Sequence, residues 1–155
     1  MNDVRRPNSP EDKGPEPHES DRLAGPKLSA EQAALAEGAQ ELLGSDLLSV
    51  GVDAGGALAL QVKAERVLDL LEWLKTGAEP SVVYLSDLHG LDGEETMAVV
   101  YHLFRQGERF EVLVKAVTPR SSPRVPSVTS LWEGASWPER EVMELFGIRI
   151  ADHPD

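Results

Sequence analysis

The first regular hydrophobic pattern in the chain follows Ser29. Apolar side chains recur there every three or four positions, the spacing that places them on one face of a helix: Leu35, Ala39, Leu42 and Leu43. Ser29 and Gln32 are spaced as in a capping box, and Gly44 favours a helix end. The segment 64–75 shows the same helical spacing and precedes Gly77. The pattern therefore predicts two helices.

Between and after these helices, apolar residues alternate with polar ones, as they do in β-strands. Residues 48–52 and 58–62 flank the turn sequence DAGG, which predicts a hairpin that turns at residues 53–56. Three more strands are predicted within 81–91, 96–104 and 109–117, the last two joined by a short turn around Gly107. The order of helix, two strands, helix and three strands is typical of an α+β two-layer sandwich with a mixed sheet.

A proline- and serine-rich segment follows, TPRSSPRVPSV at 118–128, and we expect it to be an extended, stiff loop. Two hypotheses remain for it, a surface crossover and a partner-binding arm. A short C-terminal helix is predicted next. Ser136 and Glu139 are spaced as a second capping box, Pro138 suits the first turn, and Gly147 favours the helix end.

The predicted C-terminal helix has an apolar face and a charged face. We expect the apolar face to pack on the domain; it consists of Pro138, Val142, Leu145 and Phe146. The rest is more charged than so short a helix requires, with Glu139, Arg140, Glu141 and Glu144. These residues form either a solvated surface or an ion-pair network with a second protein. Trp132 and Trp137 flank the helix and favour an interface, because tryptophan is enriched at binding hot spots, but core positions suit them as well.

Length and composition divide the chain and exclude several classes of protein. Residues 1–28 are rich in proline and charge and are predicted to be a disordered tail, 29–118 the two-layer domain, and 119–155 the loop, the helix and a C-terminal arm. The absence of cysteine excludes disulfides and cysteine-ligated zinc or iron–sulfur sites within the chain. A formal net charge of −12 argues against nucleic acid as a partner. Apolar runs are too short to span a membrane, and the N-terminus lacks a signal region, so any membrane association is expected through partners.

Candidate catalytic and metal-binding residues are few. The four histidines, His18, His89, His102 and His153, match no metal-binding spacing such as HExxH, so no metal site is predicted. His153 lies in the sequence HPD, where we expect a turn in which a carboxylate orients the imidazole. The glycines of VDAGGALAL fit no nucleotide-binding motif. A freestanding small enzyme would have to use Glu139, Arg140 and His153, and the sequence favours this hypothesis less than a structural role.

The end of the chain resembles a known family. Residues 126–155, PSVTSLWEGASWPEREVMELFGIRIADHPD, are similar to the signature of the small hydrophilic C subunit of bacterial NADH:quinone oxidoreductases, the complex I family. DLHGLDGEETMAVVYHLF resembles a strand pair of the same family, so the resemblance covers roughly residues 30–155. Glu144 replaces an aspartate of the family motif and Ile150 a phenylalanine, and both keep the chemical character. Family members usually continue past HPD, so we expect a short variant, a split gene product or a truncated chain.

The resemblance implies a non-catalytic subunit of an enzyme that transfers electrons from NADH to quinone. Such a subunit packs on the large quinone-site subunit of the peripheral arm, at the cytoplasmic face of the cell membrane. NADH, FMN, iron–sulfur clusters and quinone are expected in partner subunits. The residues that match the motif, and that we therefore assign to the interface with Trp132, Trp137 and Glu144, are Glu139, Arg140, Glu141, Gly147, His153, Pro154 and Asp155. The alternative is the equivalent subunit of an energy-converting membrane nickel–iron hydrogenase or a formate hydrogenlyase, in which the electron donor differs.

Overall fold

The computed structural model describes residues 27–155. The prediction of a disordered tail at 1–28 therefore falls almost entirely outside the described residues. None of the helices within 27–155 combines the length and the apolar character that crossing a membrane requires.

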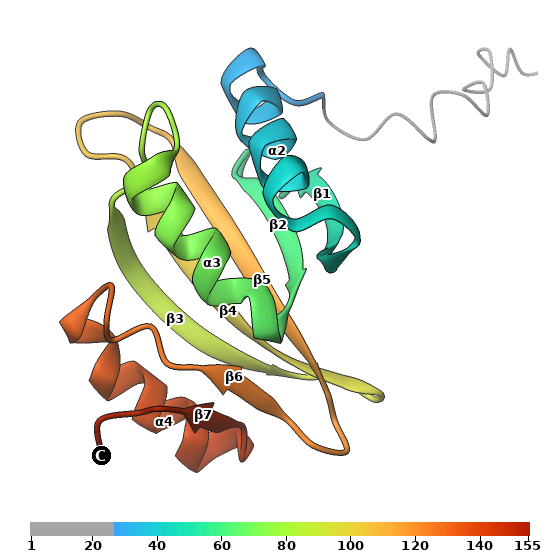
Figure 1. Ribbon diagram of the computed structural model, residues 1–155, viewed down its shortest axis with the longest axis vertical. Helices are drawn as coiled ribbons and strands as arrows, with labels where there is room; N and C mark the ends of the chain where they lie inside the picture. The colour runs from blue at the N-terminus through green and yellow to red at the C-terminus, as the bar shows by residue number, and fades with distance from the viewer. Residues whose placement is uncertain (1–26) are drawn as a thin grey trace, which may run out of the picture.

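A five-stranded mixed sheet forms one layer of the domain (Figure 1). Its strands are β1 (Leu47–Val52), β2 (Leu58–Lys63), β3 (Tyr84–Asp92), β4 (Thr96–Phe104) and β5 (Glu111–Pro119). Their spatial order is β1-β2-β5-β4-β3, and only β2 and β5 run parallel. The predicted hairpin turn forms at Asp53, whose carboxylate accepts hydrogen bonds from the N–H groups of Gly55 and Ala57. The predicted α+β fold with a mixed sheet is confirmed.

Helices form the second layer, in front of the sheet in Figure 1. Helix α2 (Ala30–Leu43) begins at the predicted capping box, in which Ser29 Oγ accepts from the Gln32 N–H and Gln32 Oε1 from the Ser29 N–H. The second predicted helix has three parts: a 3₁₀ turn (Ala64–Arg66), helix α3 (Val67–Glu72) and a π-helical turn (Trp73–Gly77). Alternate side chains of β2 and β5 face these helices and are buried: Leu58, Leu60, Val62, Val112, Val114 and Ala116.

The C-terminal segment packs on the same side of the sheet as α2 and α3. It contains helix α4 (Ser136–Phe146) and two short strands, β6 (Arg124–Pro126) and β7 (Arg149–Ala151), which pair in parallel. The prediction that 118–128 is a loop throughout was therefore wrong, because residues 149–151 supply a pairing partner that local sequence does not reveal. Side chains from this segment complete the hydrophobic core: Val125, Val128, Ala135, Val142, Ile148 and Ile150. The predicted domain boundary between 118 and 119 stays a prediction.

The opposite face of the sheet is covered by no helix or strand among residues 27–155, since α2, α3, α4 and β6 all contribute to the core on the first face. Strand β3 lies at the edge of the sheet, and its side chains alternate between the two faces. Leu88 is buried on the covered face, and Gly90 lies beneath Phe146 of α4. Helix α4 is thus held against the covered side of β3.

The contact between Gly90 and Phe146 leaves no room for a side chain. A Cβ atom at Gly90 would lie 2.5 Å from the Phe146 ring. We expect Gly90→Ala to lower the free energy of unfolding by about 1–3 kcal/mol, because the ring and with it α4 must shift. Gly51→Ala in β1 is the matched control, since a Cβ there meets nothing within 4 Å. Urea denaturation measures both variants, and equal losses would show that α4 packing is not the cause.

Candidate partner-binding site

Helix α4 begins at Ser136, but the second capping box is absent, so that prediction was wrong. The Glu139 side chain is 1% exposed. One of its carboxylate oxygens accepts from the Val128 N–H at 2.6 Å, and the other accepts from the Ser127 hydroxyl at 2.7 Å. Glu139 turns inward because these two donors, on the segment that follows β6, satisfy a carboxylate that would otherwise be costly to bury. It therefore does not belong to the exposed, charged face predicted for the helix.

Burial has the largest effect on the pKa of the Glu139 carboxyl group and raises it. The hydrogen bonds from Val128 and Ser127 and the proximity of His153 lower this pKa by a smaller amount. The Tyr101 hydroxyl is also buried, and burial raises its pKa, helped by the charge of Glu139. The hydrogen bonds of Glu139 hold α4 to the domain from the inside.

The chain turns at Asp152, just before the HPD sequence, and His153 folds back on the start of α4. Asp152 adopts a positive φ of 61°, and the His153 side chain is only 3% exposed. His153 Nδ1 accepts from the Asp155 N–H at 3.2 Å, so Nε2 is the nitrogen that donates to the Ser136 carbonyl at 3.0 Å. Glu139 Oε2 is farther from Nε2, at 3.8 Å. Backbone groups rather than a carboxylate therefore orient the imidazole at hydrogen-bonding distance, which corrects the prediction.

The outward side of α4 carries two large apolar side chains. Trp137 is 66% exposed and Leu145 is 77% exposed. Glu141 and Glu144 are exposed between them. We call these four residues, Trp137, Glu141, Glu144 and Leu145, the α4 outer stripe. The prediction that Leu145 packs on the domain was wrong, because the inward face holds Glu139, Val142 and Phe146 and the helix is rotated accordingly.

Two of the remaining predicted residues interact within the chain. The Arg140 guanidinium, partly exposed, forms an ion pair with the Asp155 carboxylate at the end of the chain. The Trp132 indole N–H donates to the Val83 carbonyl at 2.9 Å, and the Lys75 ammonium lies 5.3 Å from the centre of its ring. Gly147 ends α4, as predicted, and adopts the left-handed conformation with φ at 68°. Only Trp137 of the two tryptophans is therefore presented outward.

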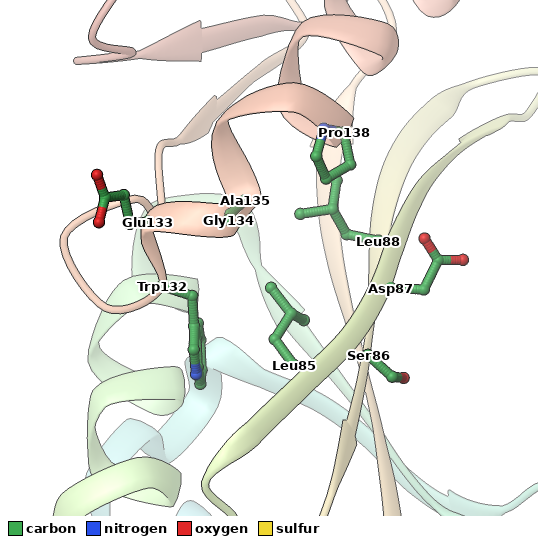
Figure 2. A pocket seen from close by; sticks show the side chains of 9 residues that line it. All are labelled: Leu85, Ser86, Asp87, Leu88, Trp132, Glu133, Gly134, Ala135 and Pro138. Carbon is green, nitrogen blue, oxygen red and sulfur yellow. The ribbon is translucent and has the colours of Figure 1, made fainter.

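A shallow pocket lies between β3 and the segment that precedes α4 (Figure 2). Figure 2 shows Leu85 and Leu88 on the side of this segment, near Trp132 and Pro138, while Asp87 points away on the other side of β3. The lining is mixed, because the polar residues Ser86 and Glu133 border the pocket together with these apolar side chains.

The structure does not bring Glu139, Arg140 and His153 together at one accessible site. The side chains of Glu139 and His153 are enclosed, whereas Arg140 lies at the surface and pairs with Asp155. The arrangement therefore gives no support to the freestanding enzyme. Sequence reasoning missed the roles of Ser127 and Val128, although both belong to the PSVT run of the C-terminal signature.

The fold and the site define a small two-layer α+β domain with a C-terminal helix that is held by buried hydrogen bonds on its inner side and exposed on its outer side. Residues 60–155 match the family model described as the respiratory-chain NADH dehydrogenase, 30 Kd subunit. The chain belongs to this family, which confirms the resemblance drawn from its C-terminal residues.

Individual relatives agree with this assignment. The chain is 36% identical over 102 residues to the C subunit of the NADH-quinone oxidoreductase of Roseiflexus castenholzii, a match that covers 64% of this chain and 59% of that protein. It is 39% identical over 98 residues to the C/D subunit of the NADH-quinone oxidoreductase of Phocaeicola vulgatus, which covers 62% of this chain and 18% of that protein. The solved trypsin-resistant fragment of Nqo5 superposes with a TM-score of 0.63 at 30% identity, covering 79% of this chain and 98% of the fragment. The chain spans 59–62% of the length of the first C-type relatives.

The hydrogen bonds of Glu139 lead to a prediction about stability. We expect Glu139→Ala to lower the free energy of unfolding by about 1–3 kcal/mol, because the Val128 N–H then stays buried without an acceptor. Glu139→Gln is the matched control, since its amide keeps an oxygen for that N–H and occupies a similar volume. Urea denaturation near neutral pH measures the three proteins, and an alanine variant as stable as the wild type would contradict the role assigned to Glu139.

The raised pKa of Glu139 also predicts a pH dependence. The folded protein holds the Glu139 proton more tightly than the unfolded chain, so this proton stabilises the fold at pH values below the ordinary glutamate pKa. The contribution is lost as the pH rises through the raised pKa of the folded state. We therefore expect the wild type to lose stability relative to Glu139→Gln between acid and neutral pH. Urea midpoints at several pH values test this, and a constant difference would contradict it.

Proposed function

We propose that the chain is a non-catalytic structural subunit in the peripheral arm of a proton-translocating NADH:quinone oxidoreductase. It packs through the α4 outer stripe on the large quinone-site subunit, at the cytoplasmic face of the cell membrane. Its partners bind NADH, FMN, the iron–sulfur clusters and quinone. The observation that carries this proposal is the exposure of Trp137 and Leu145 on a helix whose inner side is held by buried hydrogen bonds.

The α4 outer stripe has the physical character of a binding hot spot. Trp137 and Leu145 lie about two turns apart on one side of the helix, and their exposure leaves apolar surface in water. The acidic side chains of Glu141 and Glu144 lie with them and can form a polar rim. Because Glu139, Val142 and Phe146 fix the inner side of α4, little conformational entropy is lost when the outer side is bound.

The names of the relatives support both the proposed assignment to this complex and the proposed partner subunit. The relative from Phocaeicola vulgatus is a single chain named for both C and D, so the two parts are covalently joined in that protein. We infer that the corresponding D subunit is the large protein on which this chain packs. The relatives described above belong to NADH-quinone oxidoreductases, which favours an NADH-linked complex over the hydrogenase or formate hydrogenlyase alternative.

The proposal predicts that the double variant Trp137→Ala/Leu145→Ala folds normally but assembles poorly. Each truncated hot-spot residue costs about 2 kcal/mol of binding free energy, which is roughly 30-fold in Kd. The measurement is the amount of the large quinone-site subunit that copurifies with the tagged chain from the native host, together with NADH:quinone activity of the membranes. Leu48→Ala is the control, since Leu48 is an exposed leucine on β1, at the other edge of the sheet from β3. Normal assembly of the double variant would contradict the proposed interface.

Arg140→Ala separates an interface role from a structural one. The ion pair between Arg140 and Asp155 is at the surface, so we expect its loss to change the free energy of unfolding by at most about 1 kcal/mol. If a partner buries this pair, removing one member leaves an unpaired charge in the interface and costs about 3–5 kcal/mol of binding. Copurification and urea denaturation together test the variant. A large loss of stability with normal assembly of the folded protein would show that Arg140 is a structural residue.

A further inference from the structure

Three side chains of the types that bind metal ions meet on the uncovered face of the sheet. Asp87 and His89 lie on β3, and His102 lies on the neighbouring strand β4. One carboxylate oxygen and one nitrogen of each imidazole lie within 4.8 Å of one another. The centres of the two imidazole rings are 5.1 Å apart. The pairing of β3 with β4, rather than the spacing in the sequence, brings these residues together.

A β-bulge places Asp87 in this cluster. Leu85 pairs with Leu103, but the next pair along the ladder is Asp87 with His102, so Ser86 is an extra residue on β3. Ser86 uses its hydroxyl to donate to the His102 carbonyl at 3.1 Å. If Ser86 took a regular place in the ladder opposite His102, strand alternation would direct Asp87 toward the core and Leu88 toward the uncovered face. Figure 2 shows the result, with Asp87 pointing away from Leu88 across β3.

Two polar groups of the cluster also lack a partner within the described residues. His102 Nε2 is buried and has no hydrogen-bond partner among residues 27–155, which is a costly state for a ring nitrogen. Asp87 is an exposed carboxylate and takes part in none of the ion pairs formed within the described part of the chain. A cation bound by the cluster would be a partner for an imidazole nitrogen of His102 and a counter-ion for the Asp87 carboxylate.

We propose that Asp87, His89 and His102 form a binding site for a divalent transition-metal ion of the zinc class. Two imidazole nitrogens and one carboxylate oxygen are ligands that suit Zn²⁺, whereas Ca²⁺ and Mg²⁺ prefer sites made of oxygen alone. With metal–ligand distances of about 2.0–2.2 Å, tetrahedral ligand atoms lie about 3.4 Å apart. Side-chain rotation of the exposed Asp87 and of the two half-buried histidines provides the adjustment of about 1 Å that this requires.

Three protein ligands leave one tetrahedral position open. Because the cluster lies on the face of the sheet that no described helix covers, this position is accessible to water or to a donor atom from another molecule. The two strands hold the ligands on a rigid support, which favours a defined coordination geometry. The metal site lies apart from the α4 outer stripe and does not rest on the proposed assembly.

The test is Zn²⁺ binding by the purified full chain after removal of metals with EDTA. Isothermal titration with zinc chloride near neutral pH should give one Zn²⁺ per chain, and titration with cobalt chloride should give the visible absorption of a low-coordinate Co²⁺ site. We expect His89→Ala and His102→Ala to weaken zinc binding by more than the about 10–100-fold loss that follows removal of an outer-shell partner. His18→Ala is the matched control and should bind zinc like the wild type.

A third variant keeps the test independent of folding defects. Asp87 is exposed, so Asp87→Asn should fold normally, as circular dichroism can verify, while it weakens zinc binding and shifts the cobalt spectrum. A zinc concentration that just saturates the wild type should also raise the thermal midpoint of the wild type and of His18→Ala more than that of the folded site variants. The proposal is overturned if the full chain shows no saturable binding. It is equally overturned if the site variants retain the binding or if His18→Ala abolishes it.

Discussion

The buried carboxylate of Glu139 connects two parts of the C-terminal segment, helix α4 and the residues that follow β6. It joins α4 to the Ser127 hydroxyl and the Val128 N–H, which follow β6, and β6 in turn pairs with β7 just after the helix. These contacts determine how α4 is rotated about its axis. With Glu139, Val142 and Phe146 turned inward, Trp137 and Leu145 necessarily face outward. The interaction that holds the segment together therefore also selects the surface available to a partner.

Features that depend on neighbouring residues could be predicted from the sequence. The Ser29–Gln32 capping box, the hairpin turn at Asp53 and the end of α4 at Gly147 are set by groups within a few positions of one another. The strands of the sheet could be predicted too, because one face is buried against helices and the other is not, which produces a clear alternation of side chains. The family could be recognised because its signature residues occur in one continuous run.

Features that depend on distant contacts could not be predicted. Because Glu139 is charged, it was expected on the exposed side of α4. Its burial is explained by the hydrogen-bond donors of Ser127 and Val128. That inward turn moved Leu145 to the surface, so one missed contact produced two wrong expectations. The same limitation hid strand β6, which needs β7 as its partner, and the cluster of Asp87, His89 and His102. No local spacing encodes the β3–β4 register or the extra residue at Ser86 on which that cluster depends.

Strand β3 lies between the two proposed sites and keeps them on opposite sides of the sheet. Gly90 and Leu88 face α4, whereas Asp87 and His89 face the uncovered side. A partner that binds only the outward side of α4 therefore leaves the metal cluster accessible, and a metal ion bound there does not contact that partner. Contact with both sites would require a partner that extends around the edge of the sheet along β3. Because this edge strand has a neighbour on one side only, its unpaired backbone groups are themselves available to such a partner.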